Sequence, residues 1–256
     1  MTLSGLLRCL RSSSALLSPA ILLFAGFLEP LQGAPGDLVG GLVPGRNQMS
    51  LPMQIILLLT SLTLLPAVVM SITPFLRITL VLHFLRQALG TQTAPSNQVL
   101  IGLALFLTIL IMTPTAREIY QTAWAPYEKG QLSGEQALEA GSKPLKRFLL
   151  RFAREKDLKL LLEISRTAPP PRPEEVSLSV LVPAYVLSEL KAGFQIGAVL
   201  FLPFLIIDLI VASVTLSAGM VQLPPVMVSA PFKILLFVLV DGWNLIVGSL
   251  VRSFYA

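Results

Sequence analysis

The chain has 256 residues, of which 54% are hydrophobic and only 13% are charged, and its mean hydropathy is +0.76. Because soluble domains carry about 25% charged residues, this composition excludes an ordinary soluble domain and predicts an integral membrane protein. The formal net charge of +5 is modest and the basic residues gather in one loop, so nucleic-acid binding is not expected. One cysteine and one histidine, Cys9 and His83, cannot form a disulfide or a multi-histidine metal site within one chain, and no cofactor or metal is predicted.

Residues 1–34 are predicted to be a signal peptide. Arg8 and Arg11 supply the positive start, and residues 15–28 supply an apolar core of suitable length. An uncleaved membrane anchor is the alternative, because the small residues that follow match the usual cleavage pattern poorly. In either case the next segment, the Gly- and Pro-rich residues 35–50, is expected to be a linker outside the cytoplasm.

Residues 51–116 form the first predicted membrane region. From Leu51 to Leu89 the chain is apolar for longer than the roughly 20 residues that one span needs, and Pro66 and Pro74 interrupt it. Since proline removes a backbone donor and disfavours helix in the residue before it, we expect a broken helix or a membrane-embedded helical hairpin.

A turn is predicted at residues 89–98, with Gly90 and Pro95 as breakers and Ser96 as a candidate N-cap. Residues 99–116 are uncharged and nearly all apolar, so they form a second predicted span. The first membrane region therefore contains two predicted spans.

Residues 117–177 are polar and are predicted to form a helical domain on the periplasmic side. Between Leu145 and Arg154, apolar and basic residues alternate at helical spacing, which indicates an amphipathic helix. The many Lys and Arg residues would favour the cytoplasm, whereas a signal peptide followed by two spans favours the outside. Loops of about 60 residues cross the membrane largely regardless of charge, so we favour the outside.

Residues 178–256 form the second membrane region, again with two predicted spans. Its apolar stretches lie at about 184–219 and 226–251, and a turn at 222–225 separates them. The first stretch is long and contains glycine and proline, so a kinked helix or a hairpin is expected.

Five charged residues lie inside or at the ends of these last apolar stretches. An ionisable group near the centre of a bilayer costs roughly 2.5–3.5 kcal/mol on insertion scales, so these groups are expected to face protein partners or a water-filled path. The five residues are Glu189, Lys191, Asp208, Lys233 and Asp241.

Lys233 and Asp241 are eight residues apart and are predicted to share a helix face, too far from each other for a direct pair. We interpret Lys233 as half of an ion pair between subunits, with Asp208 as a candidate partner. The alternative is a lysine that snorkels near a helix end. Glu189 and Lys191 are predicted to point to different faces of one helix. They either make separate contacts or mark the solvent-exposed start of that helix.

Arg77, after Pro74, is the remaining charge of interest. It is interpreted either as a membrane-interface arginine or as a subunit contact or carbonyl cap at a helix break. No serine-hydrolase, zinc-protease, P-loop or dinucleotide-binding motif is present in the sequence, so no catalytic residue is assigned.

Four long motifs are similar to the FliP family, the export-gate proteins of the bacterial flagellar type III secretion apparatus. The motifs are FLRITLVLHFLRQALGTQTAPSNQVLIGLALFLT (75–108), LVPAYVLSELKAGFQIG (181–197), LPFLIIDLIVASV (202–214) and PFKILLFVLVDGWNLIVGSL (231–250). The resemblance implies an all-α integral membrane protein whose kinked helices and helical hairpins assemble into a cone-like channel. It also implies a pentameric ring with FliQ and FliR, through which unfolded flagellar proteins cross the inner membrane at the flagellar basal body.

Family members carry a Met-rich loop before a Pro-Pro turn, which constricts the channel as a flexible gasket. The matching segment is AGMVQLPP, so the resemblance assigns the pore loop to Met220, Val221, Gln222 and Leu223. Val221 and Gln222 stand where further methionines are usual, and methionine suits a seal that reshapes around cargo. An ordinary helix–helix turn is the alternative.

A different functional class is kept as the alternative to the export gate. In a proton-conducting or motor-coupling membrane protein, Asp208 or Asp241 would be a titrating carboxylate. Replacing Asp208 by Asn separates the two, because a relay needs the proton whereas a structural contact tolerates the change.

Overall fold

The computed structural model describes residues 51–91, 94–166, 170–219 and 224–255, and every regular element in these ranges is a helix. The predicted all-α integral membrane fold is confirmed. The predicted signal peptide (1–34), the linker (35–50) and the candidate pore loop (220–223) lie outside the described residues. The chain divides into two compact units, Met1–Thr63 and Leu64–Ala256.

The first described helix, α4 (Leu51–Ser71), has no charged residue, and almost all of its side chains are exposed. Its residues Pro52–Ser71 have a mean hydropathy of 2.1, enough to cross a membrane. Pro66 lies inside the helix, whereas the break comes at Pro74, which precedes α5 (Phe75–Ala88). The long apolar block is therefore two helices, and the second proline separates them.

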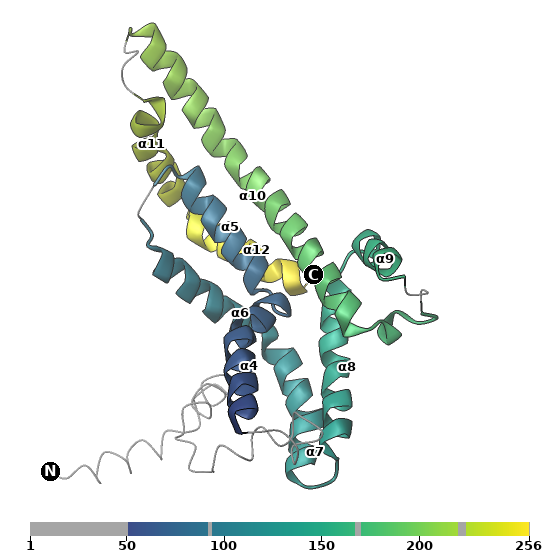
Figure 1. The fold of residues 1–256 in the computed structure, drawn as a ribbon. Helices are drawn as coiled ribbons and strands as arrows, with labels where there is room; N and C mark the ends of the chain where they lie inside the picture. The colour runs from purple at the N-terminus through teal and green to yellow at the C-terminus, as the bar shows by residue number, and fades with distance from the viewer. Residues whose placement is uncertain (1–50, 92–93, 167–169, 220–223, 256) are drawn as a thin grey trace, which may run out of the picture. The chain divides into compact units, whose positions relative to one another are not determined.

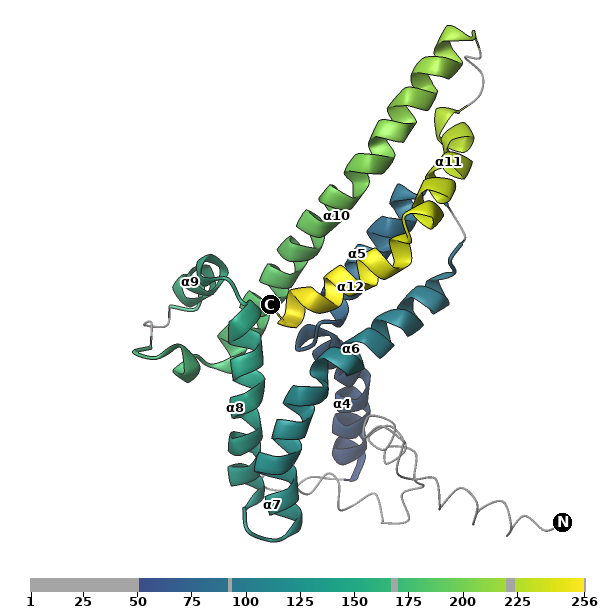
Figure 2. The same ribbon diagram turned by 180° about the vertical axis from the view of Figure 1, so that it is seen from behind.

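The largest contact within the second unit joins α5 to α10 (Leu178–Ser217), a single helix of 40 residues. The two lie side by side in both views (Figures 1 and 2). Two glycines of α10 allow this approach: a Cβ built at Gly193 would lie 2.7 Å from a Leu80 methyl carbon, and one built at Gly197 would lie 2.3 Å from the Phe84 ring. Of the two forms expected for this stretch, a kinked helix or a hairpin, the structure shows a single helix that continues through both of its prolines from Leu178 to Ser217.

After α10 the chain reverses and α11 (Pro225–Leu239) returns beside it (Figure 1). The axis then bends by 65° into α12 (Gly242–Tyr255). Val240 and Asp241 form the break, and Asp241 has a φ of 50°. The last apolar stretch is therefore two helices, whereas the sequence pattern predicted one.

The polar part of the chain follows α6 (Asn97–Ile119), which continues through a π-helical turn, η2 (Tyr120–Trp124), into the short α7 (Ala125–Glu128). Helix α8 (Gly134–Phe152) then returns beside α6 and α7 (Figures 1 and 2). Ser133 and Gln136 form a capping box at its start, which satisfies two backbone donors there.

Helix α9 (Glu155–Ile164) and a 3-10 turn, η3 (Pro173–Glu175), lead into α10. The predicted amphipathic pattern ends at Phe152, because Ala153 and Arg154 are extended and Arg154 precedes α9. Leu149 of α8 is fully buried in a core with α9 and the start of α10, including Leu181 and Tyr185.

Among the residues that the structure describes, three helical stretches are long and apolar enough to cross a membrane, or four if the bent α11–α12 pair counts as one span. Besides α4, they are Asn97–Glu128, with 32 residues, and Leu178–Ser217, with 40.

Candidate functional site

The first of two ion pairs with a buried member joins the start of α5 to α10. Arg77 Nε donates to Glu189 Oε2 at 2.8 Å, and a second guanidinium nitrogen contacts Oε1 of the same carboxylate. Glu189 is fully buried and Arg77 nearly so. A bidentate arginine–carboxylate pair fixes orientation as well as charge, so this contact sets the position of α5 on α10.

The Arg77 guanidinium also reaches two other helices. Its Nη1 donates to Ser253 Oγ at 3.2 Å, and its central carbon lies 4.1 Å from the centre of the Phe254 ring, both in α12. The Phe152 ring of α8 lies 5.6 Å away. We call Arg77, Glu189, Phe152, Ser253 and Phe254 the Arg77 cluster. It brings α5, α8, α10 and α12 to one point.

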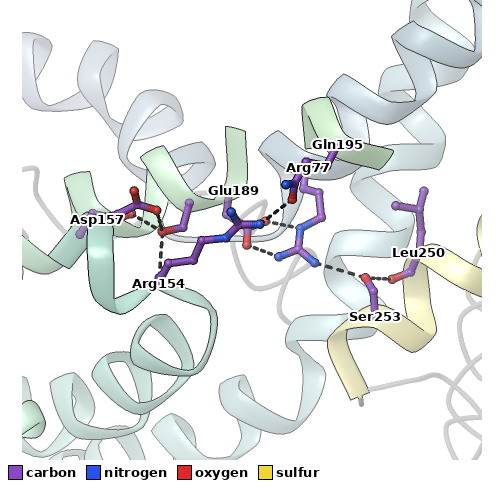
Figure 3. A network of polar contacts seen from close by, with 9 residues as sticks. Arg77, Arg154, Asp157, Glu189, Gln195, Leu250 and Ser253 are labelled. Carbon is purple, nitrogen blue, oxygen red and sulfur yellow. Dashed lines mark hydrogen bonds and ion pairs between the residues drawn. The ribbon is translucent and has the colours of Figure 1, made fainter. Parts of the chain in front are cut away.

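A polar network lies beside this cluster (Figure 3). The Ser188 hydroxyl donates to Asp157 Oδ2 at 2.7 Å and accepts the Arg154 backbone N–H at 2.9 Å. The Arg154 side chain donates to Gln195 Oε1 at 2.6 Å. These bonds tie the α8–α9 junction to α10, next to the Arg77 pair.

The second ion pair lies further along α10, toward the turn into α11. Lys233 Nζ donates to Asp208 Oδ2 at 2.6 Å, and the Ser229 hydroxyl donates to the other carboxylate oxygen. Lys233 is 3% exposed, and its nitrogen also lies near Gly90, at the end of α5. We call Asp208, Ser229 and Lys233 the Lys233 cluster.

The pairing of Lys233 differs from the interpretation based on sequence, which placed this pair between subunits. Both partners belong to one chain, because the reversal after α10 brings α11 back alongside it. Lys233 and Asp241 do not share a helix face either, since α11 ends at Leu239. Asp241 sits in the break and accepts a bond from Asn244 at 3.1 Å.

The remaining predicted charge, Lys191, is exposed on α10, whereas Glu189 is fully buried. The two therefore occupy different environments, as the helical spacing predicted. The structure thus gathers four of the six predicted charges into two pairs and leaves Lys191 and Asp241 exposed.

Several residues of both clusters were not identified from the sequence. Ser229 lies one turn before Lys233 on the same helix, and that spacing was available as a signal. Phe152 and Phe254 gave no such signal, because each is far in sequence from Arg77, and Asp157 of the neighbouring polar network is likewise far in sequence from Ser188.

Comparison with known proteins identifies the family. The family model described as "FliP family" matches residues 58–250. The chain is 50% identical over 222 residues to the flagellar biosynthetic protein FliP of Pectobacterium carotovorum subsp. carotovorum, covering 87% of this chain and 86% of that protein. It is 49% identical over 208 residues to the flagellar biosynthetic protein FliP of Bacillus subtilis (strain 168), covering 81% and 94%. Identity to the protein of the same name from Borreliella burgdorferi is 42% over 213 residues. This chain therefore belongs to the FliP family.

Proposed function

We propose that the chain is a core channel subunit of the flagellar type III protein export apparatus and passes unfolded flagellar proteins across the inner membrane. The family match spans most of the chain and covers both the Arg77–Glu189 and the Lys233–Asp208 ion pairs. Its relatives are named flagellar biosynthetic proteins. We assign the chain a mechanical role, ring formation and gating, and no catalytic one.

The observation that carries the oligomeric part of this proposal is the length and exposure of α10. Its 40 residues extend about 60 Å at 1.5 Å per residue, about twice the hydrocarbon core of a bilayer. Large apolar side chains nevertheless remain exposed along much of it, from Phe194 to Leu216. The exposed part from Phe194 to Leu216 alone extends about 35 Å, slightly more than one bilayer core, so neighbouring chains would be needed wherever this surface lies outside the lipid. A pentameric ring with FliQ and FliR would supply such neighbours.

The two ion pairs fit this arrangement. Each neutralises a buried charge within its own chain, so the apolar helices can pack in a low-dielectric surrounding without an uncompensated ion. The exposed charges Lys191 and Asp241 are the candidates for contacts between subunits. The Lys233–Asp208 pair can also lie next to a contact between subunits, since the Asp208 side chain keeps 32% of its surface exposed.

The location of the parts follows from the same proposal. Residues 117–177 would form the periplasm-facing domain, and the segment Met220, Val221, Gln222 and Leu223 would constrict the channel. Its flanks are described: α10 ends at Ser217, and Pro224 precedes α11. The loop thus joins two antiparallel helices at one end of the second unit.

The geometry gives little support to the alternative function, a proton relay through Asp208 or Asp241. Asp208 is held by Lys233 and Ser229, which is the environment of a structural carboxylate. Asp241 lies in the break between α11 and α12 and accepts a bond from Asn244 in the first turn of α12.

The test is an in-frame deletion of the gene in the source bacterium, complemented from a plasmid. Secretion of hook protein into the medium and swimming are both measured. Loss of both, restored by the intact gene, supports the export gate, whereas normal secretion by paralysed cells would overturn it. Asp208→Asn alone would leave the Lys233 charge buried without its partner, so the matched variant combines Asp208→Asn with Lys233→Met. This double variant should retain secretion if the carboxylate is structural.

A further inference from the structure

Helix α5 packs one side against α11 and α12, a second side against α10, and turns a third side outward. Its buried residues Ile78, Leu82 and Leu85 lie in cores that include residues of α11 or α12, whereas Leu80 and Phe84 meet α10. Figure 1 shows α5 in front of α12, and Figure 2, from behind, shows α11 and α12 in front of α5. The outer sides of α5 and α12 therefore face in different directions.

The outer side of α5 carries an arginine that lacks an acidic partner. Arg86 and His83 are half-buried on this side, and Gln87 is exposed. Arg86 Nη2 lies 3.3 Å from His83 Nδ1, which must accept the bond because a guanidinium only donates. Within the described ranges, no ion pair includes Arg86. Its charge is therefore balanced by no carboxylate in this part of the chain.

The break before α12 presents the opposite charge. Asp241 is exposed there, accepts a bond from Asn244, and belongs to none of the ion pairs of the described residues. The Phe237 ring packs over Gly242, where an added Cβ would lie 2.2 Å from the ring. This contact fixes the bend that carries the carboxylate.

A groove of about 600 Å³ runs from this break along the outer side of α12. Asp241 lies at its acidic end and Arg252, eleven residues later, at its basic end, with Gly248 and Ser249 between them. A helix with one cation near one end of its contact side fits such a groove in one direction only. The outer side of α5 has this pattern, because Arg86 is its one permanent charge and lies near the end of the helix.

Arg86 and Asp241 lie at the same level of the helix bundle. Leu85, next to Arg86, shares a buried core with Phe237 and Ile246, which lie four residues before and five residues after Asp241. In a cyclic ring whose axis follows α10, rotation brings a patch of one subunit against a different patch of the next subunit at the same level. The two opposite charges meet this requirement.

The exposed lysine of α10 meets it less well. Gly193 packs against Leu80, and Lys191 precedes Gly193 by two residues. Lys191 therefore lies about eight residues from the level of Arg86, or about 12 Å at 1.5 Å per residue. Arg86 is the better matched partner for Asp241.

We propose that Arg86 of one copy of the chain pairs with Asp241 of the next copy, with the outer side of α5 seated in the groove of α12. This inference rests on the ring assigned to the chain under the proposed function, because it needs a second copy at a fixed rotation. The carboxylate accepts from the guanidinium as a charge-assisted pair, and repetition of the contact neutralises both charges around the ring.

Cysteine crosslinking in the native assembly tests the contact without changing either charge. In a Cys9→Ser background, Gln87→Cys and Leu245→Cys place one thiol on each outer side, and both positions are exposed in the single chain. A short bismaleimide should link copies into dimers, trimers and larger multiples, whereas either cysteine alone should give nothing larger than a dimer. The matched control combines Leu245→Cys with Lys191→Cys and should give no such series.

Native gels of the same samples separate failure of the pairing from failure of the ring. An oligomeric assembly that gives no series, or that gives an equal series with the control, would overturn the pairing and leave the proposed ring intact. A chain that remains monomeric in its native membrane would refute the ring and the pairing together.

Neutral variants test whether the two side chains act as one contact. Arg86→Gln and Asp241→Asn remove the charges, and asparagine tolerates the positive φ at position 241. Each variant should lower the yield of the oligomer by about tenfold, as expected when one partner of an interfacial charge pair is removed. The double variant should lose no more than either single one. Two losses that multiply in the double variant would overturn the pairing.

Discussion

Phe84 packs directly on Gly197 where α5 meets α10, and this contact predicts a large effect from one added methyl group. A Cβ at Gly197 would lie 2.3 Å from Phe84 Cδ2 and 2.7 Å from Cγ. The ring cannot easily move away, because Phe194 and Phe201 lie on either side at centroid distances of 5.4 and 6.1 Å. Gly197→Ala should therefore force the two helices apart.

The expected magnitude follows from two opposing effects. Overpacking a tight contact costs about 1–3 kcal/mol, and this clash falls at the base of a held ring, so the upper half of that range applies. Replacing glycine by alanine inside a helix returns about 0.5–1 kcal/mol. The net expectation is a loss of about 1–2.5 kcal/mol. Gly102→Ala in α6 is the matched control, because a Cβ there meets nothing within 4 Å and only the helix gain applies.

The assay is unfolding of the detergent-solubilised protein by added SDS, followed by the loss of helical circular dichroism. Gly197→Ala should unfold at a lower SDS fraction than the parent chain, and Gly102→Ala at the same or a higher one. Phe84→Leu alone should be destabilising, but in combination with Gly197→Ala it should recover part of the stability that Gly197→Ala loses. A double-mutant cycle measures this coupling between the two positions. Equal midpoints for the two glycine variants would refute the close approach of α5 and α10.

Four further predictions concern polar contacts and use the same SDS assay unless stated. Arg77→Ala leaves the Glu189 carboxylate buried without a partner and should cost about 3–5 kcal/mol. Arg77→Lys should also destabilise, because a lysine cannot form the bidentate contact. Lys233→Met should cost less than Arg77→Ala, since Asp208 keeps 32% of its side-chain surface exposed and water can reach it; an equal or greater loss would contradict this ranking. Ser133→Ala removes half of the capping box of α8 and should cost about 1 kcal/mol. The loss should appear as faster hydrogen exchange of the backbone amides in the first turn of α8. Unchanged exchange in that turn would contradict the prediction.

The sequence was sufficient to predict the class of fold and the need for charge compensation. The apolar stretches, the turns and the charges inside them are local features, and local features determine where helices form. Local features could not predict which residues these charges pair with. Arg77 and Glu189 are 112 residues apart, and Lys233 and Asp208 are 25 apart. Their pairing depends on which helices lie together, and no pattern within a single helix shows that.

The positions of the helix breaks also could not be predicted from the proline residues alone. Each proline removes a backbone hydrogen bond, so a break or kink was expected wherever one interrupts an apolar stretch. Pro203 nevertheless lies inside α10, whereas the break after α11 occurs at Val240 and Asp241, where there is no proline. A long helix with many other backbone bonds and a neighbour along one side continues through a single missing bond. The break at Asp241 comes instead from its positive φ. The sequence pattern around Asp241 did not indicate this backbone conformation.

The contacts of α5 show how charge and shape together determine one helix register. Arg77 meets Glu189, Leu80 meets Gly193 and Phe84 meets Gly197, each pair further along both helices, so α5 and α10 run parallel. Displacing α5 by one turn, about 5.4 Å, would separate the ion pair and would leave only one of Leu80 and Phe84 opposite a glycine, because the two glycines are themselves one turn apart, so the other side chain would be driven against a residue that carries a Cβ. A buried ion pair contributes little net stability compared with apolar packing. We therefore infer that the glycine contacts supply most of the attraction between these helices, and that the ion pair makes every other register costly.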